Sequence, residues 1–182
     1  MKSKLLTSCA LFMVLVSLPL LSFAQEQGKF RGGFELGGLV PIEGKMGILL
    51  SLELKYNIKN NMNVGFQTEF TSTMENKDNS ESLNLFSVSY DYYFHEKNKS
   101  FSPFIGGGLG YYLSSALDAG QGIRTNYNNP TCFIRTGFEI GHFRTSLNYN
   151  FIRRKNVESY NINHDYIAIH FGFYIGGGKW KK

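Results

Sequence analysis

Nine charged side chains recur at alternating positions in segments that are otherwise rich in small and apolar residues. They are four bases and five acids: Arg31, Glu35, Glu53, Lys55, Glu69, Asp91, Arg135, Glu139 and Arg144. Near-balance of the two signs indicates mutual ion pairing, because an unpaired charge held away from water is strongly destabilising. Such a set either closes an enclosed space and fixes strand register, or lines a small ion-conducting pore.

Histidine is the other candidate for chemistry. His170 is the one histidine inside a predicted strand, and no serine can be assigned to it as a nucleophile, so we expect a buried hydrogen-bonding role. His95, His142 and His164 lie in connections and look solvated, and their spacing gives no metal set. The glycine-rich run 106–110 has no helix after it, unlike a nucleotide-binding loop. We expect no catalytic residue, metal or cofactor.

The segment Met46–Ile58 shows which elements position the charges. Every even residue is apolar, and the odd residues are small or polar except Leu49. Period two over this length predicts a strand with one apolar and one polar face. The strand is long for a soluble sheet, where about five or six residues is typical, and suits a tilted membrane strand of roughly 9–11 residues.

The same alternation predicts eight strands, an even number as bacterial barrels require. Their ranges are 30–40, 46–58, 62–73, 83–94, 102–114, 131–141, 143–152 and 165–175.

The predicted connections alternate in length. Short turns are expected at 59–61, 95–100 and around Gly141, and longer loops at 73–82, 115–130 and 153–164, whereas 41–45 is a short exception. Short turns on one side and long loops on the other are typical of outer-membrane barrels, with the short turns and both termini in the periplasm.

The polar face decides between a soluble and a membrane barrel. A solvated surface would be dense in lysine and glutamate, but Lys55 is the only strand lysine on this face. The face is also rich in glycine, which needs a reason within a strand. The interior of a narrow eight-stranded barrel supplies one, because it barely holds side chains. The large apolar residues then face lipid, and a lipocalin-like soluble barrel is the less favoured alternative.

Aromatic residues gather near the predicted strand ends. One group lies near the short turns (Tyr56, Tyr92, Tyr93, Phe94 and Phe101) and another towards the long loops (Tyr111, Tyr112 and Phe151). We expect them to form two girdles at the membrane interfaces, although strand propensity alone also favours aromatics.

The first 24 residues predict export. Lys2 and Lys4 precede a mostly apolar run, and Ser22 and Ala24 are small residues before a cleavage point after Ala24. We therefore expect a signal peptide at 1–24 and one barrel domain at 25–182. The mature chain would carry net charge +3, because residues 1–24 hold two of the 19 bases and none of the 14 acids. That excess is no nucleic-acid footprint, and Cys132 alone cannot form an intramolecular disulfide.

Two segments carry a resemblance to a known group. Residues 102–112, Ser-Pro-Phe-Ile-Gly-Gly-Gly-Leu-Gly-Tyr-Tyr, resemble the fifth strand of the small outer-membrane β-barrel family, the porin-like or opacity-like group. The ending at 171–178, Phe-Gly-Phe-Tyr-Ile-Gly-Gly-Gly, is similar to members from Bacteroidota. The size and loop pattern resemble OmpA- and OmpX-type barrels. The resemblance implies an eight-stranded antiparallel up-and-down transmembrane β-barrel in the cell outer membrane.

The expected function is a structural or surface-interaction role, with the lumen closed by the charged network. A narrow porin-like channel for small solutes or ions is the alternative, and a lipid-modifying enzyme is less favoured. The basic cluster Arg153, Arg154 and Lys155 is a candidate contact for lipopolysaccharide phosphates, with a solvated loop start as the other interpretation. We expect a monomer whose partners are outer-membrane lipid, lipopolysaccharide and the barrel-assembly machinery, with no nucleic acid.

Overall fold

A computed structural model describes residues 25–42, 46–76, 79–94, 101–118, 123–152 and 165–178. These residues form eight strands: β1 (Phe30–Pro41), β2 (Gly47–Lys59), β3 (Met62–Asn76), β4 (Asn79–Tyr93), β5 (Phe101–Asp118), β6 (Ile123–Ile140), β7 (Phe143–Ile152) and β8 (Tyr166–Gly176). In this part of the chain, no helix has the length and apolar character needed to cross a membrane.

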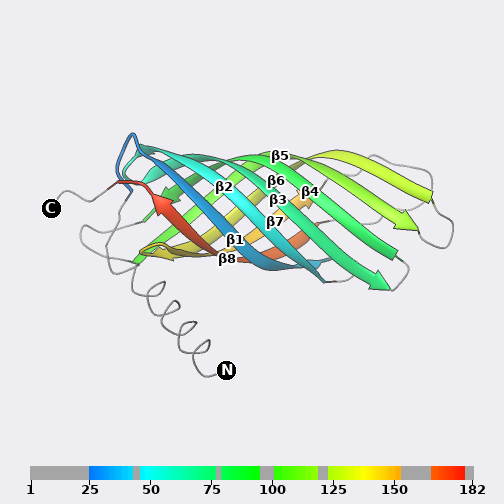
Figure 1. Cartoon of the computed structure of the whole chain (residues 1–182). Coiled ribbons are helices and arrows are strands. Elements are labelled where there is room, and N and C mark those ends of the chain that lie inside the picture. The colour runs from blue at the N-terminus through cyan, green and yellow to red at the C-terminus, as the bar shows by residue number, and fades with distance from the viewer. Residues whose placement is uncertain are drawn as a thin grey trace, which may run out of the picture.

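Each strand pairs antiparallel with the next, and β8 returns to pair with β1, so the sheet closes into a barrel (Figure 1). Phe34 of β1 lies opposite Leu52 of β2 on one side and Phe173 of β8 on the other. Closure leaves no free sheet edge along the shared length of the strands, so every strand has two hydrogen-bonding neighbours. The predicted closed antiparallel barrel is confirmed.

The burial of β2 follows the alternation of its sequence. Ser51, Glu53 and Lys55 are buried, whereas Leu52 and Leu54 between them are 48% and 54% exposed. The same inversion holds in β7, where Arg144 is buried and Leu147 is 47% exposed. The outer wall is therefore apolar, and the interior is largely polar.

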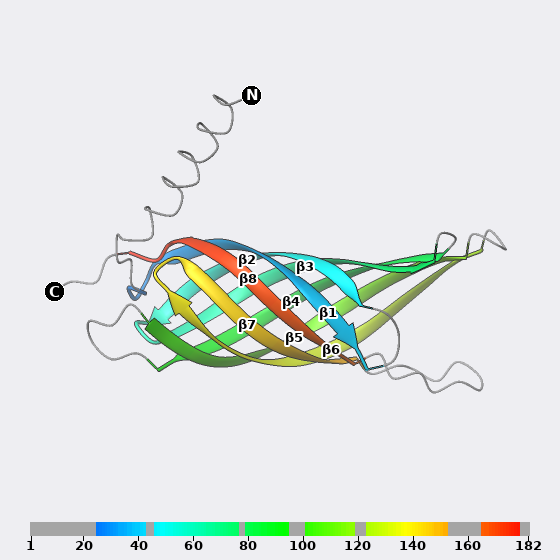
Figure 2. The ribbon, with the colours of Figure 1, turned by 90° about the horizontal axis from the view of Figure 1, so that it is seen from below.

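The wall of the barrel is uneven in height. β5 and β6 have 18 residues each, whereas β7 has 10. Antiparallel pairing continues to Asn79↔Asp118 and Asp118↔Ile123, and the last β6–β7 pair is Thr131↔Ile152. The predicted long loop at 115–130 is therefore wrong: most of it is strand, and it extends beyond the end of β7 (Figure 2).

The predicted loop at 73–82 is corrected in the same way. β3 runs on to Asn76 and β4 begins at Asn79, so most of this segment is strand as well. Backbone pairing needs no apolar side chain once a hairpin rises past the apolar part of the wall. Polar, turn-rich composition was therefore a misleading signal there.

The two ends of the described chain meet at the opposite end of the barrel. The Glu26 amide donates to the Gly177 carbonyl at 2.6 Å, and the Gly28 amide donates to the Asn57 carbonyl at 2.8 Å. The Asn57 side-chain amide also donates to the Glu26 carbonyl at 3.1 Å. Residues 25–29 are thus bonded to β2 and to the end of β8.

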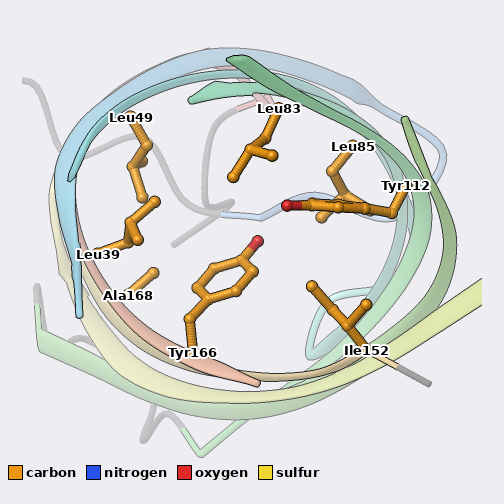
Figure 3. Packing of buried hydrophobic residues seen from close by; sticks show 8 residues of the cluster. All are labelled: Leu39, Leu49, Leu83, Leu85, Tyr112, Ile152, Tyr166 and Ala168. Atoms are coloured by element: carbon orange, nitrogen blue, oxygen red, sulfur yellow. The ribbon is translucent and has the colours of Figure 1, made fainter. Parts of the chain in front are cut away.

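A cluster of inward apolar residues occupies the end of the lumen farthest from the termini. It consists of Leu39, Leu49, Leu83, Leu85, Tyr112, Ile152, Tyr166 and Ala168. These side chains come from six strands and point towards the barrel axis (Figure 3). The lumen is therefore apolar at this end and charged towards the termini.

Candidate functional site

All nine charged residues singled out in the sequence lie inside the barrel, and none is more than 5% exposed. Alternation places them on the inner face, and strand pairing then brings opposite charges together. Glu139 of β6 lies opposite Arg144 of β7, for example, and their side chains form an ion pair at 3.1 Å. The cluster of these nine residues is called the charged core below.

Glu139 anchors the part of the charged core nearest the termini. It accepts from Arg31 at 2.8 Å and from the Tyr93 hydroxyl at 2.7 Å. The Gln25 side-chain amide lies 3.3 Å from the same carboxylate. Arg144 donates to the Tyr93 oxygen at 2.8 Å and to Glu139 at 3.1 Å, so two bases and a phenol share one acid.

Asp91 lies at the centre of the charged core. Its carboxylate accepts from Lys55 at 2.6 Å, from Arg135 at 2.7 and 2.9 Å, and from Arg144 at 3.2 Å. Three bases from three different strands therefore converge on one buried acid. A buried carboxylate is stable only with such compensation.

Glu53 provides the second acid of this centre. It accepts from Arg135 at 2.7 Å and from Ser89 at 2.8 Å, and it lies 3.4 Å from Lys55. The Tyr174 hydroxyl oxygen lies 2.5 Å from Glu53 and 3.0 Å from Glu35, so its single proton can be donated to either carboxylate. Tyr174 thus links two acids that lie on the neighbouring strands β1 and β2.

Glu69 lies apart from the four bases. Its carboxylate accepts from the Tyr166 hydroxyl at 2.9 Å and lies 3.9 Å from His170 Nε2. His170 Nδ1 lies 3.4 Å from Glu35, which in turn is 3.2 Å from Arg144. His170 therefore connects Glu69 to the rest of the charged core, and four bases are matched by the four remaining acids.

Aromatic rings pack against the charges. The Arg144 guanidinium lies 3.8 Å from the centre of the Phe104 ring and 5.5 Å from that of Tyr174, and Lys55 Nζ lies 5.0 Å from the Tyr174 ring. Cations at these distances are attracted by the ring faces. Phe133 stacks similarly near Arg135, at 5.5 Å.

These inward rings are what the sequence interpretation missed. Tyr93 and Tyr112 were assigned to interfacial girdles, but they are 1% and 7% exposed and lie inside the barrel. The missed signal was parity: Tyr93 is two residues from Asp91, and Tyr174 is four residues from His170. Strand alternation alone would have placed them inside.

His142 is a further correction. It was expected to be solvated, but it is 7% exposed, and its Nδ1 lies 2.6 Å from the Tyr174 carbonyl. The Tyr174 amide donates to the His142 carbonyl at 2.8 Å. The β6–β7 turn is thereby bonded to the end of β8.

Several glycines make room for this packing. A Cβ added to Gly33 would overlap the Tyr174 ring, and one added to Gly65 would lie 2.7 Å from Glu53. A Cβ on Gly106 would meet the Asp91 carboxylate. These glycines therefore lie under rings and carboxylates that fill the lumen.

The contacts of the charged core are ion pairs and hydrogen bonds. The contacts of His170 are with Glu35, Glu69 and Asn148, which do not form a pair of nucleophile and base. No group of acidic, histidine or cysteine side chains that could hold a metal ion occurs among the described residues. The predicted cleavage point after Ala24 and the basic cluster at 153–155 lie outside the described residues.

Comparison with known proteins identifies the fold. No protein-family model matches the chain, and no curated protein matches its sequence. Among solved structures, Neisserial surface protein A is similar with a TM-score of 0.67 and 15% identity, over 82% of this chain and 97% of that one.

Other similar structures agree. The N-terminal β-barrel domain of Pseudomonas aeruginosa OprF has a TM-score of 0.56 and 15% identity, over 83% of this chain and 100% of that one. The outer membrane enzyme PagL has a TM-score of 0.50 and 14% identity, over 80% and 98%. At these identities the likeness shows the fold alone, and that fold is the closed eight-stranded barrel of outer-membrane proteins.

Proposed function

We propose that this chain is an integral outer-membrane protein whose lumen is closed and whose role is structural or in surface interaction. The support for membrane insertion is the outer wall, where Ile48, Leu109 and Ile134 are 71%, 72% and 59% exposed. Such a surface is unfavourable in water and suited to hydrocarbon, and the closed sheet leaves no unpaired backbone edge in the bilayer. The expected signal peptide supplies the route of export.

The proposed orientation follows from the unequal ends. The short turn at Asn60–Asn61, the turn at Gly141–His142 and residues 25–29 share one end, which we assign to the periplasm. The extended hairpins of β3 to β6 then project from the cell surface. Their reach beyond the wall is what favours a role in contact with external partners.

The observation that carries the closed lumen is the convergence of Lys55, Arg135 and Arg144 on Asp91 inside the barrel. These side chains come from β2, β6 and β7, and the side chains of the apolar cluster point into the lumen beyond them. Eight strands enclose only enough space for side chains. Two successive layers of inward side chains therefore support a closed lumen.

The direct test is single-channel recording of the refolded barrel in a planar bilayer. We expect no discrete conductance steps from the natural chain, with a bacterial porin in the same bilayers as the positive control. Conductance steps that disappear in a Glu53→Gln or Arg135→Gln variant would contradict the closed lumen and assign the charged core to a pore.

A narrow channel is the second candidate, and one observation favours it. Between the charged core and the apolar cluster, Ser87 Oγ, Ser146 Oγ and Asn148 Oδ1 are buried without a hydrogen-bond partner. Buried polar atoms of this kind are commonly satisfied by internal water. The same recordings decide between a trapped water layer and a continuous path, because only the path gives a current.

For the surface role we propose that Arg153, Arg154 and Lys155 contact lipopolysaccharide phosphates. The support is their position directly after Ile152, at the end of β7 that we assign to the outer leaflet. Charge reversal at all three should weaken co-purification of lipopolysaccharide, with Lys29→Glu at the opposite end as a control. Unchanged co-purification would remove this contact from the proposal.

We also propose that the chain is not an enzyme. Its fold is shared with PagL, but His170 is enclosed by the charged core. Measured hydrolysis of lipopolysaccharide acyl chains that is lost in a His170→Ala variant would overturn this part of the proposal.

A further inference from the structure

A hollow of about 570 Å³ lies in the wall near the end of β7. Its outward-facing lining comes from three neighbouring strands: Leu109 of β5, Pro130 and Cys132 of β6, and Phe151 of β7. None of the nine residues of the charged core lines the hollow. Thr131, Ile152 and Asp165 complete the lining, and the exposed residues Leu109, Pro130 and Phe151 place the hollow on the outer wall.

Strand register explains why the wall is hollow here. Leu109, Cys132 and Phe151 lie in one row across the sheet, so a small side chain stands between two larger ones. In the next row Pro130 lies opposite Tyr111 and has no partner in β7, which has ended. The floor of the hollow follows β6, and β5 and β7 form its sides.

The sides of the hollow are apolar, and ring packing holds one of them in place. Leu109 is 72% exposed, and the Phe151 ring packs on Tyr149 with ring centres 4.5 Å apart. Asp165 lies at one end, where its carboxylate accepts from the Ile152 amide at 2.9 Å and from the Tyr149 hydroxyl at 3.3 Å. That acid is engaged by the barrel itself, so it does not make the hollow a polar site.

Position determines what can occupy the hollow. Ile134, the next outward residue of β6, is exposed but does not line the hollow, whereas on β5 the lining includes the highly exposed Leu109. In a bilayer the surrounding medium there is hydrocarbon, where association depends on close packing and not on a hydrophobic drive. The hollow is a trough that would contact a bound hydrocarbon chain on three sides, whereas the convex wall elsewhere would contact the chain on one side.

We infer that this trough holds an acyl chain of lipopolysaccharide. The inference rests on the proposed function, because lipopolysaccharide meets this end of the wall only if the extended hairpins face outward. The small residues Cys132 and Pro130 give the trough its depth, and the ligand is recognised by shape along its hydrocarbon. A larger side chain in place of Cys132 would fill the trough.

The test is photo-crosslinking in bilayers that contain lipopolysaccharide with a diazirine on an acyl chain. Crosslinked residues are mapped by mass spectrometry. We expect several-fold enrichment at the trough relative to Val88, an outward residue that is 59% exposed on β4. A Cys132→Phe variant should lose the enrichment. Ile134→Phe adds bulk at the next outward position of the same strand and should keep it.

The outcomes separate the two proposals. Crosslinks spread around the wall in proportion to exposure would overturn the trough as a binding site, even if the protein fractionates with the outer membrane. Enrichment with a diazirine phospholipid but not with lipopolysaccharide would overturn the choice of lipid. Failure to fractionate with the outer membrane would overturn the proposed function itself. Heat-modifiable gel migration of both variants shows whether they are folded.

Discussion

Replacing Asp91 by asparagine should be among the most damaging single changes in the barrel. Asp91 is fully buried and pairs with Lys55 at 2.6 Å, Arg135 at 2.7 Å and Arg144 at 3.2 Å. Asparagine has nearly the same shape but no charge. Apart from Glu69, which lies away from the bases, the change leaves four bases facing three acids, with one positive charge buried without compensation.

The size of the effect can be estimated from the general cost of breaking a buried ion pair. Removing one partner typically destabilises by about 3–5 kcal/mol, since the remaining charge stays buried. With a urea dependence of about 2 kcal/mol per molar, the unfolding midpoint should fall by roughly 2 M. Ser87→Ala, at an inward position on the same strand with an unpartnered hydroxyl, should shift it far less.

The assay is urea unfolding of the refolded barrel in lipid vesicles, followed by loss of heat-modifiable migration. A second variant tests the electrostatic cause: Lys55→Met added to Asp91→Asn restores the charge balance and should recover part of the lost stability. An Asp91→Asn midpoint equal to that of Ser87→Ala would refute the reasoning. A double variant less stable than Asp91→Asn alone would show that packing, not charge, dominates.

Two further predictions address packing and the lipid-facing wall. Gly106→Ala should destabilise the barrel by about 1–3 kcal/mol, because the added Cβ would meet Asp91 and the Tyr90 carbonyl. Gly32→Ala is the control: its Cβ enters open space, so the change should be neutral or stabilising by up to about 1 kcal/mol. Equal unfolding midpoints of the two variants in urea would contradict this prediction. Leu52→Arg, near the middle of β2 on the outer face, should cost about 2–4 kcal/mol in vesicles. Leu52→Ala is its control, and an arginine variant as stable as the alanine variant would mean that this face does not meet hydrocarbon.

The sequence was sufficient for the strands and for the facing of the charges. Period-two patterns such as Met46–Ile58 need only local information, because neighbouring side chains of a strand point to opposite faces. The strand ranges agree with the structure to within a few residues except at the long hairpins. There, Asn79 pairs with Asp118 and the hairpins rise beyond the wall, and polar composition is compatible with either strand or loop.

The individual ion pairs within the charged core could not be predicted from the sequence. Which base meets which acid depends on strand register and on reach across the lumen: Arg31 lies opposite Lys55 in the sheet, yet its partner is Glu139 on the far side. The predicted positions of the inward aromatic rings were wrong for another reason. The preference of aromatic side chains for membrane interfaces predicts girdle positions for Tyr93 and Tyr112, but strand parity places both inside the barrel.

Rings, glycines and charges together explain why the lumen should stay closed when one ion pair is lost. The cross-section is limited by eight strands, so a large inward ring requires a small residue nearby, as Tyr174 requires Gly33 and Phe133 requires Gly108. Arg144 then packs between Phe104 and Tyr174 and is held by dispersion and ring attraction as well as by its acids. Removing Asp91 therefore takes away charge compensation but little volume. Stability and conductance should separate: the Asp91→Asn barrel unfolds more readily, yet its lumen remains filled by the same rings.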